Sequence, residues 1–116
     1  MTTAERYELL MEAFLLDAEK QMRALLEARV VLETAPADAD AWDQVRRGAH
    51  TIAGNAAMMG FDDIMRAGRS LERRAIAVAE RGGVASDVWA LDGEWKTLDR
   101  LLATLDLDVP GAGAAA

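Results

Sequence analysis

The chain of 116 residues contains no cysteine, only two prolines and a single histidine. Without cysteine there are no disulfides and no thiolate metal sites, and nothing follows about a redox compartment. Aromatic residues make up only 5% of the chain, whereas alanine and leucine are abundant, and this balance favours helix over strand. No apolar run approaches the roughly 18 residues that a membrane-spanning helix needs. The composition therefore predicts one helical domain without a transmembrane segment.

The charge balance is acidic, with a formal net charge of -7. Such a chain is poorly suited to bind nucleic acid or an anionic membrane, and we expect neither as a partner. The N-terminus, MTTAERYELL, has no basic region followed by an apolar stretch, so it does not look like a secretory signal. Hydrophobic residues at 52% and charged residues at 28% are typical of a soluble globular protein. We expect a cytoplasmic location.

The first of four predicted helices begins at Thr2 or Thr3 and reaches about Glu33. Thr2 and Glu5 have the spacing of a capping box, and Thr3 alone is the other candidate cap. Pro36 disfavours helix at the residue before it, so the helix stops there. The apolar residues that recur at helical spacing are Tyr7, Leu10, Phe14, Ala18, Met22, Leu25 and Leu32.

Three further helices follow, each with its own end signals. The second helix is capped by Asp38 or Asp40 and reaches Met59, just before Gly60. The third helix runs from an Asp62 cap to Arg81, just before Gly82 and Gly83. The fourth helix starts at a Ser86 cap and keeps its apolar pattern to Leu105. Four amphipathic helices with short loops predict an all-α, antiparallel up-down four-helix bundle over residues 1–109. Residues 110–116, with nothing to bury, are expected to form a frayed tail.

The only histidine, His50, lies on the second of these helices, away from the apolar stripe. At about 100° per residue, one stripe is formed by Val45, Ala49, Ile52, Ala56 and Met59. His50 lies roughly 140° from the centre of that stripe, so its ring is expected to face solvent. An incidental surface histidine is the alternative interpretation.

Three other large side chains are assigned from their positions in the helices. Met58 is expected to fill the core. Trp42 and Trp89, near helix starts, are expected to be partly exposed and available for docking.

The neighbours of His50 on the helix surface favour a binding role. Arg46 and Arg47 precede it by one turn and could donate hydrogen bonds to a phosphoryl group, or simply form a solvated basic turn. Gly54 follows it by one turn, where glycine costs about 1 kcal/mol relative to alanine, and leaves room for another protein's surface. Because Gly68 also falls inside a predicted helix, a glycine within a helix is weak evidence on its own.

The stretch from Ala49 to Glu72, AHTIAGNAAMMGFDDIMRAGRSLE, resembles the signature of histidine-containing phosphotransfer (HPt) domains. The matching positions are His50, Ile52, Gly54, Ala56, Gly60, Leu71 and Glu72. The resemblance implies that His50 carries phosphate on Nε2, accepting it from an aspartate of one receiver domain and passing it to another. It also allows a break near Phe14, which would create a short extra N-terminal helix.

The same resemblance implies the partners: response-regulator receiver domains and a hybrid sensor histidine kinase. The receiver would supply Mg²⁺, so no cofactor is expected on this chain. Without a GxxxxGK[ST] loop the chain cannot make phosphohistidine from ATP, and we expect a monomeric phosphocarrier rather than an enzyme. The docking surface is predicted around Ala53, Gly54, Ala57 and Phe61.

One departure from the signature concerns Ala53, where the family usually has a basic residue. Arg46 or Arg47 is a candidate to replace that charge. A degenerate HPt-like bundle that binds a partner without carrying phosphate is the alternative function. Metal chemistry is not expected, because a zinc site usually needs two or more Cys or His ligands and a di-iron bundle needs Glu-x-x-His pairs. A Ser-His-Asp hydrolase is disfavoured because no nucleophile elbow is present.

Overall fold

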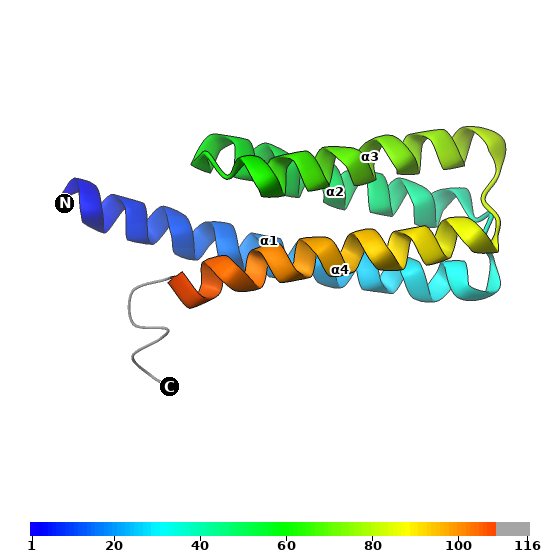
Figure 1. Ribbon diagram of the computed structural model, residues 1–116, viewed down its shortest axis with the longest axis horizontal. Coiled ribbons are helices and arrows are strands. Elements are labelled where there is room, and N and C mark those ends of the chain that lie inside the picture. Colours follow the sequence, from blue (N-terminus) through cyan, green and yellow to red (C-terminus); the bar gives the residue numbers. More distant parts are fainter. Residues whose placement is uncertain (109–116) are drawn as a thin grey trace.

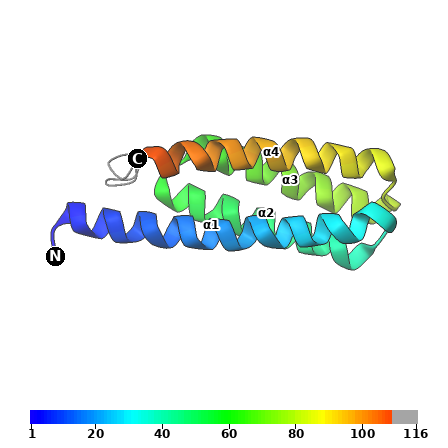
Figure 2. The same ribbon diagram turned by 90° about the horizontal axis from the view of Figure 1, so that it is seen from below.

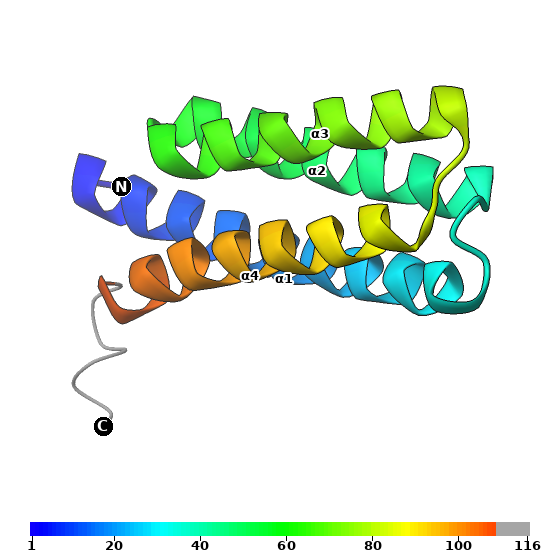
Figure 3. The same cartoon turned by 45° about the vertical axis from the view of Figure 1, so that its right-hand side comes forward.

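The computed structural model describes residues 1–108, all of whose regular elements are helices. They are α1 (Thr3–Thr34), α2 (Ala39–Met59), α3 (Asp62–Arg81) and α4 (Ala85–Asp108). The helices alternate in direction, and each packs against two neighbours, α1 against α2 and α4, and α3 against α2 and α4 (Figure 1). The α2–α3 hairpin lies over the α1–α4 pair, as Figures 2 and 3 show from two further sides. The predicted all-α antiparallel bundle is confirmed; the predicted tail, 110–116, lies outside the described residues.

Several helix ends lie where capping chemistry places them. Glu5 donates its backbone N–H to Thr2 Oγ1 at 3.1 Å, and the Thr2 N–H returns to Glu5 Oε1 at 3.3 Å, so the capping box is confirmed. Asp38, rather than Asp40, caps α2 by accepting the Ala41 N–H at 2.8 Å. Gly60 ends α2 with a φ of 78°, a left-handed conformation that residues with side chains avoid.

Three expectations about helix ends were wrong. α1 runs without a break past Phe14, because no Gly or Pro interrupts it; the Phe14 ring is buried and packs edge-to-face on Phe61 with centroids 5.2 Å apart. No extra N-terminal helix therefore forms. Asp62 is the first residue of α3 rather than its cap; Phe61 takes the cap position and makes no side-chain capping hydrogen bond.

Ser86 is also not a cap, since it lies inside α4. The side chain that organises this helix start is Asp87, which accepts the Val84 N–H at 2.9 Å and binds the Arg81 guanidinium at 2.6 and 2.9 Å. The Asp87 side chain is only 8% exposed. One carboxylate thus ties the end of α3 to the start of α4.

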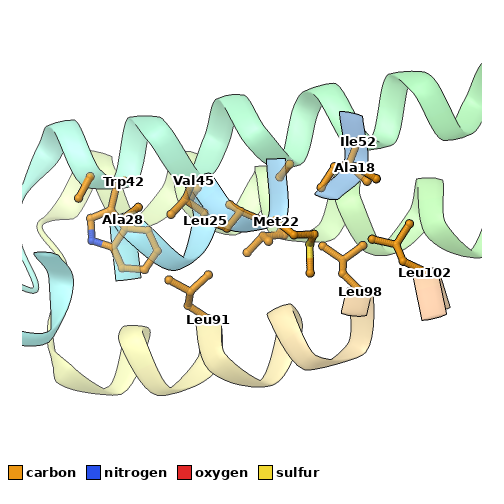
Figure 4. Packing of buried hydrophobic residues seen from close by; sticks show 14 of the residues in the cluster. Ala18, Met22, Leu25, Ala28, Trp42, Val45, Ile52, Leu91, Leu98 and Leu102 are labelled. Atoms are coloured by element: carbon orange, nitrogen blue, oxygen red, sulfur yellow. The ribbon is translucent and has the colours of Figure 1, made fainter. Parts of the chain in front are cut away.

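The core runs along the middle of the bundle, where apolar side chains of all four helices meet (Figure 4). Trp42 is fully buried rather than partly exposed, because the loop before α2 and the loop between α3 and α4 both cover it. Its indole N–H donates to the Pro36 carbonyl at 2.8 Å, and Gly83 lies so close that a Cβ there would come within 2.6 Å of Trp42 Nε1. Trp89 is 74% exposed, in agreement with the prediction.

The predicted stripe of α1 is buried from Phe14 onward but exposed at its start. Tyr7 and Leu10 are 49% and 58% exposed, because the first turns of α1 extend past the ends of α2 and α3 (Figure 1). Met58, expected in the core, is 82% exposed, whereas Met59 is half-buried against the core cluster. Within the described residues, no helix is both long enough and apolar enough to cross a membrane.

The Arg81–Asp87 pair predicts a pH-dependent contribution to stability. The hydrogen bond from Arg81, with that from the Val84 backbone, lowers the pKa of the Asp87 carboxyl from 3.8 to about 2. A carboxyl with a lowered folded-state pKa stabilises the fold above its unfolded pKa, and the stabilisation disappears as the pH falls through the folded pKa. We expect Asp87→Asn to lower the urea midpoint at neutral pH, and its deficit relative to wild type to shrink between about pH 4 and pH 2.

Urea unfolding followed by circular dichroism at several pH values measures this deficit. Ser86→Ala is the matched control and should leave the midpoint nearly unchanged, because Ser86 makes no capping bond. A deficit of the same size at every pH would contradict the assigned role of the Asp87 carboxylate.

Candidate functional site

The candidate site is centred on His50, near the middle of α2 on its outer side. The neighbouring Ala49 and Ile52 are buried in the core, whereas the His50 side chain is 69% exposed. The helical spacing of apolar residues therefore predicted the direction of this ring correctly. An exposed imidazole at a fixed position on a rigid helix is accessible to another protein.

The ring is oriented by a carboxylate from the next helix. His50 Nδ1 lies 2.6 Å from Glu72 Oε2, and the Glu72 side chain is only 20% exposed. An ionised carboxylate can only accept hydrogen bonds, so Nδ1 carries the proton in this contact. In the neutral ring Nε2 then keeps its lone pair. The pair thus selects the tautomer whose outer nitrogen is a nucleophile.

The approach of α3 to α2 that permits this contact depends on Gly68. A Cβ at position 68 would lie 3.0 Å from the Ala53 Cβ and 3.2 Å from both the Ala49 oxygen and the Ala53 nitrogen. Two of these three atoms belong to the backbone of α2, which cannot move aside as a flexible side chain can. The absence of a side chain at Gly68 therefore lets the helices pack closely, one turn away from Glu72.

The predicted docking residues divide into buried and exposed ones. Ala53 is only 3% exposed, so its assignment to the docking surface was wrong; it packs under Gly68 because α2 contacts α3 as well as α1. Gly54 and Ala57 are exposed, and a Cβ at Gly54 would meet no atom within 4 Å. Phe61 is half-buried against Phe14.

The two arginines proposed beside a phosphoryl group are held by a carboxylate instead. Arg46 binds Asp43 Oδ1 at 2.9 Å, and Arg47 binds Asp43 Oδ2 at 3.2 Å. Both guanidinium groups are thus engaged one turn before His50, and no hydrogen bond joins either of them to the imidazole in the described structure.

Glu72 is the site residue to which sequence reasoning gave no role. It was counted as part of the signature, 22 residues after His50, and that fixed spacing was the available signal. Its carboxylate acts on a histidine from another helix, so the contact depends on how the two helices align. Among the described residues, no group of three or more His, Cys, Asp or Glu side chains is arranged to hold a metal ion.

Comparison with known proteins agrees with this arrangement. The model of the Hpt domain family matches residues 9–107. Chemotaxis protein CheA of Halobacterium salinarum is 32% identical over 104 residues, which cover 84% of this chain and 16% of that protein. The chain thus spans about a sixth of the length of this relative. No solved structure matches the chain.

The structure and the family match therefore agree. The structure is a four-helix bundle with an exposed, carboxylate-bound histidine on its second helix, and the match covers nearly the whole chain. The chain belongs to the Hpt domain family, the histidine-containing phosphotransfer domains of two-component signalling.

Proposed function

We propose that this domain is a phosphorelay intermediate that accepts a phosphoryl group on Nε2 of His50 from a receiver-domain aspartate and passes it to another receiver. The observation that carries the proposal is the contact between His50 Nδ1 and Glu72 at 2.6 Å. It fixes the proton on the inner nitrogen of an exposed ring and leaves the outer nitrogen free to attack.

The transfer step follows from this arrangement. The Nε2 lone pair attacks the phosphorus of the aspartyl phosphate, a new N–P bond forms, and the acyl O–P bond breaks. Its electron pair returns to the receiver's carboxylate. The ring gains positive character during the step, and the Glu72 carboxylate, accepting the Nδ1 hydrogen bond, stabilises that charge. The reverse sequence delivers the phosphoryl group to the next receiver.

The remaining requirements would come from the partner. Phosphoryl transfer depends mainly on positioning and on neutralising the charge of the phosphoryl oxygens. The receiver contributes the aspartate, Mg²⁺ and a lysine, and this domain contributes the oriented imidazole. In this proposal the domain is a monomeric cytoplasmic carrier rather than an enzyme, and the receiver domain of a hybrid sensor histidine kinase is its phosphate donor.

The surface beside His50 supports docking of such a partner. Gly54 and Ala57 follow the histidine on the outer side of α2 and present almost no side-chain bulk. Met58, 82% exposed at the end of the helix, adds a flexible apolar side chain of the kind that adapts to different partners. We propose that these residues, with the edge of Phe61, form the receiver-docking surface.

Phosphorylation of the only histidine is directly testable. The wild-type domain is incubated with phosphoramidate, a donor that needs no protein partner, and separately with a phosphorylated receiver. We expect the mass of one phosphoryl group on the protein, lost in acid and retained in base. His50→Gln should take up no phosphate.

The outcomes of this experiment separate the two functions. A wild-type domain that stays unlabelled with phosphoramidate and with every receiver would support the scaffold that binds without carrying phosphate. Label that persists in His50→Gln would refute the assignment of the site.

At position 54, glycine should lower the stability of the helix but leave room for a docking partner. Because no atom lies within 4 Å of a Cβ built there, Gly54→Ala should stabilise the domain by about 0.5–1 kcal/mol. The added methyl group lies one turn from His50 on the docking surface, so transfer from a phosphorylated receiver should slow, on the order of tenfold. Labelling by the small donor phosphoramidate should be unchanged.

Gly93 on α4 offers a matched control, since a Cβ there also meets nothing within 4 Å. Gly93→Ala should stabilise the domain by a similar amount and leave both reactions unaffected. Thermal unfolding and transfer rates measure the two effects. Equal receiver rates for Gly54→Ala and wild type would exclude Gly54 from the docking surface.

A further inference from the structure

The outer side of α3 carries cations beside the His50–Glu72 pair that the proposed mechanism does not use. Of the four arginines between positions 66 and 74, Arg66 binds Asp63 and Arg74 binds Glu94. Arg69 and Arg73 are exposed, and neither makes a salt bridge or a side-chain hydrogen bond among the side chains that the structure describes, those of residues 1–105. Two unengaged guanidinium groups thus flank Glu72 in the chain.

The helical position of Arg69 places it beside the histidine rather than away from it. It precedes Glu72 by three residues, so the two side chains are neighbours on the same face, with Cβ atoms about 5–6 Å apart. It directly follows Gly68, the point where α3 touches Ala53 on α2. Viewed along the axis of α3, the Arg69 side chain lies about 60° from Glu72 on the side away from the core, and Arg73 lies about 100° from Glu72 on the same side. Arg69 therefore lies on the outer side of α3, level with Ala53 on α2.

Phosphorylation of His50 would create a charge problem at this place. The phosphoryl group brings its negative oxygens to the ring that the Glu72 carboxylate already holds, and like charges at short range repel. α2 does not supply a counter-charge, because position 53 is an alanine and both Arg46 and Arg47 are engaged by Asp43.

We propose that Arg69 binds the phosphoryl group carried on His50 and supplies from α3 the positive charge that position 53 lacks. The planar guanidinium fork matches two phosphoryl oxygens, which a lysine can contact only as a point charge. No ion pair within the described structure must break for Arg69 to turn toward the phosphate. The inference rests on the proposed function of His50 and adds a phosphoryl-binding residue to it.

The test compares Arg69→Gln with Arg73→Gln, which removes the same charge from the same helix one turn later. With phosphoramidate as donor, Arg69→Gln should slow labelling of His50 about tenfold. Arg73→Gln should stay within about twofold of wild type, and Arg69→Lys should recover part of the rate. Circular dichroism checks that each variant is folded, which is expected because both side chains are exposed.

A phosphorus NMR titration of the phosphorylated domain provides a readout that a purely structural role would not move. Removing a bound guanidinium favours the protonated phosphoryl group, so Arg69→Gln should shift its protonation to higher pH, while Arg73→Gln should not. If wild type is labelled and both variants match it in rate and titration, the role of Arg69 is refuted and the proposed function stands. If wild type takes no label from phosphoramidate or from any phosphorylated receiver, the proposed function itself fails.

Discussion

The short hydrogen bond between His50 Nδ1 and Glu72 is the contact on which the chemistry of this domain depends. It joins two helices, decides which ring nitrogen holds the proton, and turns the other nitrogen outward. Its existence requires α3 to approach α2 more closely than most side chains allow. Gly68 against Ala53 provides that approach, so two of the smallest residues in the chain support its reactive one.

This close packing has a consequence for charge. A small buried residue at position 53 leaves α2 without a cation beside the imidazole, and Asp43 engages the nearest arginines of that helix. The positive charge that phosphate needs must then come from the partner or from the rim of α3. Stability is provided elsewhere: Trp42 and the Arg81–Asp87 pair hold the end of the bundle where the α1–α2 and α3–α4 loops lie.

The sequence predicted what depends on local spacing and missed what depends on contacts between helices. The direction of His50, the capping box at Thr2 and the turn at Gly60 follow from periodicity and backbone preference. Trp42 was misplaced because the loop between α3 and α4, which is distant in sequence, folds over it. Ala53 was misplaced because one apolar stripe predicts one buried side, whereas α2 packs on both α1 and α3. The same reason hid the role of Glu72, whose reach to the ring depends on the alignment of two helices.

Whether Glu72 holds the proton on Nδ1 and leaves Nε2 free can be measured without any partner. Because the chain has one histidine, a long-range proton–nitrogen NMR spectrum of the ring shows a single pair of nitrogen signals. At a pH where the ring is neutral, we expect Nδ1 to carry the proton and Glu72→Ala to abolish this preference. A wild-type spectrum with the proton on Nε2 would contradict this expectation.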